Sequence, residues 1–473
     1  MNVILVSFPR TQEVRNNKET IPVGILYIAS YLQKKGHNPI IIDFSILHIP
    51  DNISPPEFFA DVIEKEIHLK RPGLIGLNCF DSMKFLWVRE TAKILYNTYP
   101  EIPISTGGLH PTYFAYDILN NCPEISYICL GEGEETMAEL ASSLQVNDID
   151  NIKKIDALAL RERSKIIINS RNFFSLNLDD YGIPLWNLIQ LENYYSDHSS
   201  YWNPKNQNIN LVVPILSSRG CPFSCSFCSV KKFMGGKLRL RSPKLVVDEI
   251  ELLYNRYRQR YFEFIDDNLT VNRNHVLNIC QEILNRGLDI QFSLTNGIYL
   301  GNIQEEVVEA LSKAGCVMVK LPIEHGNDYI REHVIGKKVS RKNIQEASKL
   351  CKKYDIFTFG LFIMGFPEET TSTLEDTIQL MKELKLDMNY VANLIPFPET
   401  DLYFRAETGG CLISTYSSND FWKGDIQFNA DNHNEFYIKP YAMSIEDLIK
   451  YREKFNSMKY YSERAKRINN IIN

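Results

Sequence analysis

Short runs of apolar residues alternate with amphipathic stretches through the first 145 residues of the chain. The apolar runs predict buried strands at Val3–Phe8, Pro39–Asp43, Leu74–Asn78, Ile102–Thr106 and Ser126–Leu130. Between them, apolar residues recur at intervals of three and four, which predicts helices at Ile21–Lys35, Pro56–Lys70, Met83–Tyr99 and Glu134–Leu144. This alternation is typical of a parallel sheet with helices on both faces. We therefore expect a flavodoxin-like (Rossmann-like) α/β domain over residues 1–145.

The carboxyl ends of these strands carry residues suited to a ligand. Pro9 and Arg10 follow the first strand, a segment from Gly107 to Pro111 follows the fourth, and Gly131 to Glu134 follow the fifth. Ligands of open α/β sheets bind outside the carboxyl ends of the strands. The sequence therefore predicts a binding site at this edge.

A second alternating region begins after a less regular stretch. Residues 146–210 are predicted to be a linker with one small hairpin, Ala157–Arg161 and Lys165–Asn169. Strands are then predicted at Leu211–Leu216, Tyr261–Ile265, Ile290–Leu294, Val317–Pro322, Phe357–Ile363 and Met388–Asn393. Helices are predicted at Pro243–Tyr257, Arg273–Arg286, Ile303–Ala314, Arg341–Tyr354 and Glu369–Leu384. Six such units predict a partial (β/α)6 barrel of the TIM type over residues 211–410, followed by a small helical appendage at 411–473.

Composition and charge narrow the class of protein. Hydrophobic residues are 44% and charged residues 23% of the chain, which is globular usage and excludes a low-complexity or largely disordered protein. The net charge of −6 argues against a generic basic nucleic-acid surface. No apolar run reaches the ~20 residues of a membrane span, and the first residues lack the basic region of a signal peptide. We expect a cytoplasmic protein without a membrane partner.

Three of the ten cysteines stand together as C-x3-C-x2-C at Cys221, Cys225 and Cys228, directly after the first predicted barrel strand. Three soft thiolates on one loop are typical ligands of an iron–sulfur cluster. Three ligands to a four-iron cubane leave one iron open for a small molecule. The alternatives are a zinc site and unligated thiols, but structural zinc takes four ligands and no second ligand pair follows. The other seven cysteines are scattered and are predicted to be small buried residues.

The cysteine motif, with Phe227 before its last cysteine, resembles that of the radical S-adenosylmethionine (SAM) superfamily. The resemblance implies a [4Fe–4S] cluster held by the three cysteines, SAM bound at the open iron, and reductive release of a 5′-deoxyadenosyl radical. Such a radical needs a site that excludes water.

Further segments at successive strand ends resemble the same superfamily. They are Phe264–Asn268, Leu321–Gly326, Gly360–Thr370 and Ile395–Thr400. The chain departs from the usual pattern at Pro322 and His325, where Gly and Ser are usual. Glu368 and Glu399 replace glycines, which puts the backbone angles of both turns in question. The resemblance implies SAM contacts at Phe227, Asp266, Asp267, Asn296, Glu324, Met364 and Pro396.

The first domain resembles the cobalamin-binding domain of cobalamin-dependent radical SAM enzymes. The resemblance lies in Pro22–Leu32, Gly36-His37, Ile42-Asp43 and the loops after the fourth and fifth strands, and with the barrel it covers about residues 1–410. It implies cobalamin contacts at Pro9, Arg10, Gly24, Gly107, Gly108, His110, Gly131, Glu132 and Glu134. The chain lacks the D-x-H-x-x-G histidine that ligates cobalt in methionine-synthase-like domains, which the resemblance implies is usual for the radical branch.

Three functions remain open at this point. The first is a cobalamin-dependent radical SAM enzyme that methylates an unactivated carbon of a small-molecule or peptide natural product, with flavodoxin or ferredoxin as external electron donor. The second is a cyclase or rearrangement enzyme with the same cofactors and no methyl transfer. The third is a non-catalytic iron–sulfur or corrinoid-binding module. A transfer-RNA methylthiotransferase is disfavoured by the acidic charge and by the absence of a basic C-terminal RNA module.

Overall fold

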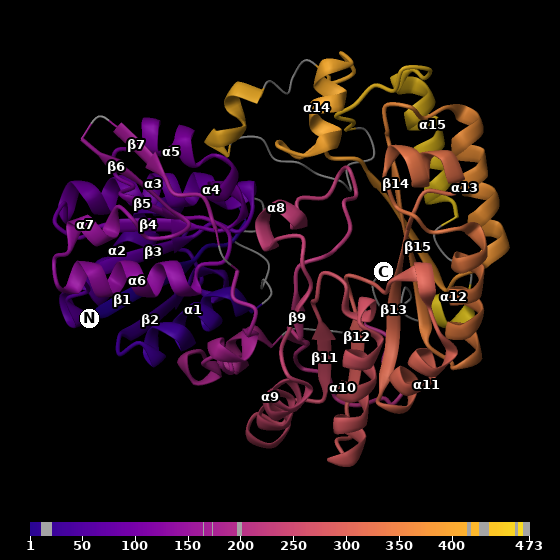
Figure 1. Cartoon of the computed structure of the whole chain (residues 1–473), viewed down its shortest axis with the longest axis horizontal. Coiled ribbons are helices and arrows are strands. Elements are labelled where there is room, and N and C mark those ends of the chain that lie inside the picture. Colours follow the sequence, from indigo (N-terminus) through magenta and orange to yellow (C-terminus); the bar gives the residue numbers. More distant parts are fainter. Residues whose placement is uncertain are drawn as a thin grey trace. The chain divides into compact units, whose positions relative to one another are not determined.

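The computed structural model describes residues 1–10, 21–163, 165–172, 174–195, 201–413, 418–424, 435–458 and 462–466. The chain forms two compact units, labelled element by element in Figure 1. Unit 1 comprises Met1–Tyr195, Lys232–Met234 and Ser417–Phe428, and unit 2 comprises Ser196–Lys231, Gly235–Tyr416 and Asn429–Asn473. No helix in these described ranges is both long and apolar enough to cross a membrane. The domain boundaries at residues 145, 210 and 410 stay predictions.

Unit 1 is built on a seven-stranded sheet of order β2-β1-β3-β4-β5-β6-β7. Its parallel strands are β1 (Asn2–Ser7), β2 (Asn38–Asp43), β3 (Leu74–Asn78), β4 (Ile104–Gly107) and β5 (Tyr127–Cys129). The order 2-1-3-4-5 is that of flavodoxin-like sheets, so the predicted class is confirmed. The predicted hairpin, β6 (Leu158–Glu162) and β7 (Lys165–Ile168), adds two antiparallel strands beside β5.

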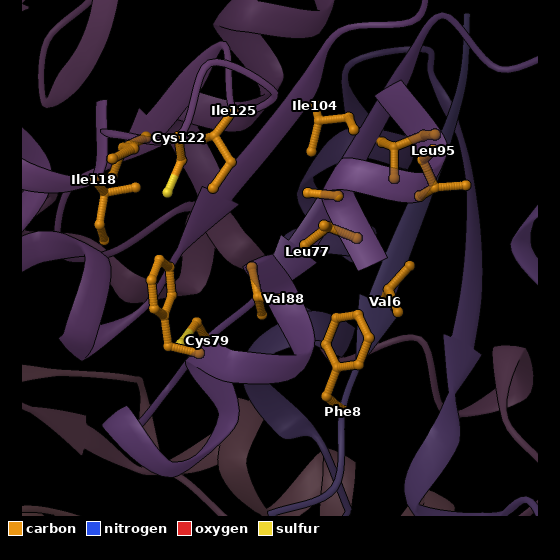
Figure 2. Packing of buried hydrophobic residues seen from close by; sticks show 14 of the residues in the cluster. Val6, Phe8, Leu77, Cys79, Val88, Leu95, Ile104, Ile118, Cys122 and Ile125 are labelled. Carbon is orange, nitrogen blue, oxygen red and sulfur yellow. The ribbon is translucent and has the colours of Figure 1, made fainter. Parts of the chain in front are cut away.

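Helices cover both faces of this sheet, because alternate residues of each buried strand point to opposite sides. In β1, Ile4 and Val6 join one hydrophobic cluster while Val3 and Leu5 join the other. Figure 2 shows part of the first cluster, where Val6 and Phe8 lie near Leu77 and Val88. The helices of unit 1 are α1 (Val23–Lys34), α2 (Pro55–Lys70), α3 (Phe85–Thr98), α4 (Leu109–Tyr113), α5 (Ala115–Asn121), α6 (Glu134–Gln145) and α7 (Ile149–Ile152).

The segment after the hairpin packs onto unit 1 rather than standing apart from it. Its short 3-10 helices are η3 (Leu178–Tyr181), η4 (Trp186–Leu188) and η5 (Leu191–Tyr194). The Tyr194 hydroxyl donates a hydrogen bond to Asp43 Oδ2 at 2.6 Å, at the carboxyl end of β2. The Ser30 hydroxyl of α1 donates to the carbonyl of Tyr181 at 2.9 Å. Part of the predicted linker therefore belongs to unit 1. The remaining 3-10 helices of this unit are η1 (Phe44–Ile46), η2 (Ser82–Lys84) and η9 (Ser418–Lys423).

Unit 2 is built on a six-stranded parallel sheet of order β8-β11-β12-β13-β14-β15. The strands are β8 (Val213–Ile215), β11 (Tyr261–Phe264), β12 (Gln291–Leu294), β13 (Cys316–Glu324), β14 (Phe357–Met364) and β15 (Met388–Asn393). Each strand pairs with its successor in sequence, so the sheet is the predicted partial (β/α)6 barrel. A two-stranded sheet, β9 (Ser218–Arg219) with β10 (Arg239–Leu240), was not predicted.

Side-chain caps set where the barrel helices begin. Ser242, Asn272, Ser340 and Thr370 each accept a hydrogen bond from a backbone N–H in the first turn of the helix that follows. The helices are α9 (Pro243–Arg256), α10 (Arg273–Asn285), α11 (Glu305–Lys313), α12 (Arg341–Lys353), α13 (Thr371–Leu384), α14 (Asp401–Thr408) and α15 (Ile445–Asn456). Helix α8 (Val230–Met234) begins in unit 2, and its last three residues are counted in unit 1. The 3-10 helices η6 (Leu269–Val271) and η7 (Leu300–Asn302) and the π-helix η8 (Ile330–Val334) complete the unit.

The two glutamates that replace usual glycines behave differently. Glu399 has φ +67°, so it keeps the left-handed backbone that favours glycine. It follows Pro398 in a turn closed by a hydrogen bond from the Thr400 N–H to the Phe397 carbonyl at 3.3 Å, where glycine is preferred at this position. Glu368 is not among the residues with positive φ, and it pairs with Arg405 at 3.3 Å.

We expect Glu399→Gly to stabilise the protein and Glu368→Gly to destabilise it. The first change removes the cost of a side chain at a left-handed residue, about 1–2 kcal/mol. Glycine loses more conformational entropy on folding, which costs about 0.5–1 kcal/mol, so the net gain in stability is about 1 kcal/mol. The second removes an ion pair and adds glycine entropy, for a loss of about 1 kcal/mol. Thermal unfolding of both variants checks this, and shifts of the same sign would contradict it.

Candidate functional site

The cysteine motif of unit 2 sits on a loop that starts at the carboxyl end of β8. After Ser217, strand β9 pairs with β10, so that Ser218 lies opposite Leu240 and Arg219 opposite Arg239. This pairing closes the base of the loop formed by residues 220–238. The cysteines are thus presented by a loop with a fixed stem, at the edge where barrels carry their active sites.

Two carboxylates at the end of β11 hold this stem. Asp266 accepts hydrogen bonds from the Ser217 N–H at 3.1 Å and the Ser217 hydroxyl at 2.7 Å, and a third from the Ser218 hydroxyl. Asp267 accepts one from the Gly220 N–H at 2.9 Å, where Gly220 has φ +83°. Burial raises the pKa of Asp266 to about 6 despite these donors. Both residues therefore position the loop, and their predicted contact with SAM stays a prediction.

The three thiols differ from the other cysteines of the chain. Cys221 and Cys225 are half-buried and Cys228 is exposed, whereas the seven scattered cysteines are all buried, as predicted. None of the ten is in a disulfide. Desolvation raises the pKa of all three loop thiols, that of Cys228 to about 12, while the charge of Lys337 opposes the rise at Cys221 and Cys225. Binding iron would therefore release protons from these sulfurs.

The donor set of this loop fits a cluster. Within the ranges the structure describes, no three His, Cys, Asp or Glu side chains meet closely enough to bind a single metal ion. The ligands of a cubane need not converge on one metal ion, because each thiolate binds a different iron. The apolar side chains around Cys225 and Phe227, among them Phe366 and Leu402, supply a poorly hydrated wall. The loop is anchored there because the Leu402 N–H donates to the Ser226 carbonyl at 2.9 Å.

Glu324 ends β13 in a strained conformation. Its φ is +67°, and a hydrogen bond of 2.9 Å from the His325 N–H to the Ile323 carbonyl closes a three-residue turn around it. The pairing of β13 with β14 is irregular at the same place. The Glu324 carboxylate lies 2.8 Å from Lys337 Nζ, which also donates to the Pro322 carbonyl at 2.5 Å. Strain of this kind in a non-glycine residue is typical of functional positions.

The other predicted SAM residues lie at neighbouring strand ends of unit 2. Asn296 follows β12, is exposed, and donates to the Ile265 carbonyl at 2.9 Å. Met364 ends β14 and is fully buried, while Pro396 is buried after β15. Phe227 is half-buried against Phe366, with ring centroids 6.4 Å apart. The carboxyl edge of one sheet thus carries all seven predicted residues.

The predicted cobalamin residues of unit 1 lie mainly at the carboxyl ends of β1, β4 and β5. Gly108 has φ +116°, and a Cβ there would meet the Cys79 carbonyl at 2.3 Å, so only glycine fits. Gly107 lies close to the Cys129 backbone, and Gly131 has φ +68°. The Gly131 N–H donates to the Thr112 hydroxyl at 2.8 Å. These glycines let the loops lie close together.

The same edge of unit 1 presents both charge and apolar surface. Arg10 follows Pro9 and pairs with Asp81 at 3.2 Å, which joins the ends of β1 and β3. Phe80 is 55% exposed although it adjoins a buried strand. Gly24 in the first turn of α1 is exposed, and a Cβ there would meet nothing within 4 Å. An exposed aromatic ring and open backbone suit a large flat macrocycle such as cobalamin.

Three other predicted cobalamin residues are buried within unit 1. His110 is 1% exposed, and its ring nitrogens lie 2.9 Å from Ser82 Oγ and 3.0 Å from the Trp422 carbonyl. Burial lowers its pKa to about 3, so the ring is neutral. Glu132 and Glu134 are 5% and 3% exposed. His110 already has partners for both nitrogens, and its contact with cobalamin stays a prediction.

Sequence reasoning missed Lys337, Glu369 and Ser217. Lys337 contacts Glu324, Glu369 accepts from the Gly365 N–H at 2.7 Å, and Ser217 holds Asp266. Glu369 stands directly before Thr370, which caps the next helix, and this position could have indicated that its side chain is buried. Lys337 had no signal, because a lysine in a polar loop is ordinarily solvated.

Comparisons with known proteins match a different family model to each of these two regions. The chain matches the family model of the radical SAM superfamily over residues 215–381 and that of the B12 binding domain over residues 16–141. Its fold is similar to that of the radical SAM methyltransferase TsrM of Kitasatospora setae, solved with tryptophan substrate and a SAM analog. The TM-score is 0.73 at 17% identity, covering 96% of this chain and 88% of that one.

Two curated relatives are similar over most of this chain. An uncharacterized methyltransferase of Pyrococcus horikoshii is 29% identical, covering 88% of this chain and 85% of the relative. The anaerobic magnesium-protoporphyrin IX monomethyl ester cyclase of Cereibacter sphaeroides is 26% identical, covering 81% of this chain. This chain spans 60% of the cyclase.

Because the folded pKa of His110 lies below its unfolded value, acid should destabilise unit 1 through this residue. The neutral ring contributes stability that is present above pH 6.5 and lost as the pH falls toward about 3. The loss approaches about 1.4 kcal/mol per pH unit within that window. His110→Gln keeps a donor and an acceptor but cannot titrate. Urea unfolding at pH 7 and pH 5 should show a smaller loss in the variant, and equal losses would contradict the assignment.

Removing one loop thiol should abolish cluster loading. We expect anaerobically reconstituted Cys225→Ala to lose most of its iron, sulfide and visible cluster absorption, because two thiolates hold a cubane poorly. The matched control is Cys280→Ala, which removes a buried thiol of α10 in the same unit. Iron and sulfide analysis checks this. Iron retained in Cys225→Ala, or lost equally in Cys280→Ala, would contradict it.

Proposed function

This chain belongs to the cobalamin-dependent radical S-adenosylmethionine enzymes, and we propose that it methylates an unactivated carbon of a small-molecule or peptide natural product. The observation that carries the proposal is the pairing, in one chain, of a three-thiol barrel loop with a B12-binding sheet. A relative named as a methyltransferase shares both regions over most of its length.

The chemistry would come from three bound groups. When bound, a reduced [4Fe–4S] cluster would supply the electron for cleavage of SAM to a hydrogen-abstracting radical, and methylcobalamin would supply the methyl group. The cluster would need an external source of electrons, and we propose that a donor such as flavodoxin or ferredoxin supplies them. An acidic chain with net charge −6 offers no general basic surface for such acidic donors, so we expect a local basic patch to receive them.

Unit 2 would bind the cluster and SAM. Cys221, Cys225 and Cys228 would hold the cluster and leave one iron without a protein ligand. Glu324 would accept a hydrogen bond from the polar part of SAM, with Lys337 2.8 Å from its carboxylate fixing the position of that group. Met364 and the wall around Phe227 would exclude water from the radical.

Unit 1 would hold cobalamin at the carboxyl edge of its sheet. Gly107 and Gly108 have no side chain to hold a ligand away from the backbone, and Phe80 offers an exposed ring for apolar contact. Arg10, fixed by Asp81, places a positive charge at the same edge for an anionic group such as the phosphate in the nucleotide tail of cobalamin.

A second candidate, ring closure without methyl transfer, is favoured by the similarity to the cyclase. Both functions need the same two sites, so the mass of the product separates them. Methyl transfer adds one carbon, whereas cyclisation adds none.

We expect the holoenzyme to transfer the CD3 group of labelled SAM to a compound in a small-molecule extract of its source organism. The assay is anaerobic, with reductant and with cobalamin supplied, and mass spectrometry seeks a product that carries CD3 together with deoxyadenosine. Enzyme reconstituted without cobalamin is the control and should give no labelled product. Deoxyadenosine with an unlabelled product would contradict methyl transfer and support the cyclase, and neither product would contradict both.

A further inference from the structure

One buried pair of side chains joins two of the strand-end loops of unit 2 that carry predicted SAM contacts. His325 follows Glu324 at the end of β13, and Glu369 closes the turn after β14. Both side chains are 0% exposed, and His325 Nε2 lies 3.2 Å from Glu369 Oε1. Neither atom meets the geometry of a hydrogen bond with any partner in the part of the chain that the structure describes. Their 3.2 Å separation is therefore a close polar contact between two buried groups.

The hydrogen bonds around the ring fix its proton. The Asn327 N–H donates to His325 Nδ1 at 3.0 Å, so Nδ1 is an acceptor and the ring proton is on Nε2. Glu369 Oε1 is the carboxylate oxygen near that nitrogen, at 3.2 Å. The other oxygen, Oε2, accepts from the Gly365 N–H at 2.7 Å. The buried Glu369 side chain thus has a hydrogen bond from its own loop and a close contact with the polar ring edge of the other loop.

The backbone of His325 is held as tightly as its ring. The buried guanidinium of Arg331 donates to the His325 carbonyl at 2.8 Å and to the Val339 carbonyl at 2.6 Å. Gly326 packs directly on α13, where its N–H donates to the Thr377 hydroxyl at 3.0 Å. These contacts fix the residues on one side of Glu324, and Lys337 fixes its carboxylate.

A strained turn persists only where its surroundings hold it. Glu324 has φ +67° in a three-residue turn closed by the His325 N–H, so the position of His325 decides whether the turn survives. Through Glu369 and Gly365, the same histidine is tied to the loop that follows Met364. Its ring also lies 6.2 Å from Phe366, which in turn contacts Phe227 of the cysteine loop.

We infer that His325 and Glu369 are positioning residues that lock Glu324 and the loop after Met364 in the conformation that binds SAM. The inference rests on the proposed function, because it takes Glu324 as a SAM contact. It also gives a role to a histidine at a position where the superfamily pattern has serine. Neither residue touches SAM in this account.

The test measures SAM affinity in cluster-loaded enzyme by equilibrium dialysis with radiolabelled SAM. His325→Leu removes the donor at similar volume, and we expect the dissociation constant to rise about tenfold or more, as for partners of ligand-holding residues in general. His325→Gln can place an amide donor near the position of Nε2 and should recover most of the affinity. Iron content confirms that each variant is loaded.

A matched control separates positioning from loss of stability. Asp387 lies before β15 at the opposite end of the strands, where its carboxylate pairs with Arg464 at 2.6 Å. Asp387→Asn should lower the unfolding temperature without changing SAM affinity, whereas His325→Leu should change affinity. A dissociation constant equal to wild type in loaded His325→Leu would overturn the inference.

Two further outcomes are informative. If His325→Leu does not load, Glu369→Gln decides, because it keeps the shape and removes the charge: weaker SAM binding supports the inference and unchanged binding overturns it. Failure of the loaded wild-type enzyme to bind SAM overturns the proposed function itself, and the inference with it.

Discussion

Carboxylates that accept backbone N–H groups organise the carboxyl edge of the barrel. The buried Asp266 and the half-buried Asp267 hold the stem of the cysteine loop, and the buried Glu369 holds the turn after β14. A carboxylate in a poorly hydrated place is costly unless donors surround it. Asp266 and Glu369 therefore fix their loops strongly, since displacing either loop would remove donors from a buried acid. The raised pKa of Asp266 shows that burial outweighs even three donors there.

The same edge tolerates strain because of this fixation. Glu324 has a positive φ, a conformation that costs a side-chain residue of order 1–3 kcal/mol. Its neighbours are anchored by Arg331, Lys337 and the His325–Glu369 pair, so the strained turn has no relaxed alternative nearby. Glu399 differs, since it lies in an exposed turn where relief of the strain would leave these anchors untouched.

The alternation of apolar runs was sufficient to predict the parallel strands, because buried strands and amphipathic helices leave distinct periods. The ends of β3 and β15 were predicted to the residue, and those of the other predicted strands within two. The pattern could not show that β9 and β10 pair, since two-residue strands carry no period. Nor could it show that β6 and β7 extend the sheet of unit 1, because an edge hairpin has the same local signal wherever it docks.

Candidate site residues were predictable where chemistry and strand ends coincided, and less so where burial decides the role. The cysteine loop combined both signals. His110 had the position of a ligand residue, but its two nitrogens are used inside unit 1. The His325–Glu369 pair joins residues 44 positions apart in the sequence, and a contact between residues so far apart leaves no trace in a single sequence.

The relatives show where specificity must lie. One is named a methyltransferase and another a cyclase, yet each is similar to more than four-fifths of this chain. The parts that all three share cannot by themselves choose between adding a carbon and closing a ring, because function depends on the site rather than the fold. The radical SAM region and the B12-binding region of this chain would serve either outcome. The choice of product must therefore come from side chains that face the substrate, which shape how close its radical carbon comes to the methyl donor.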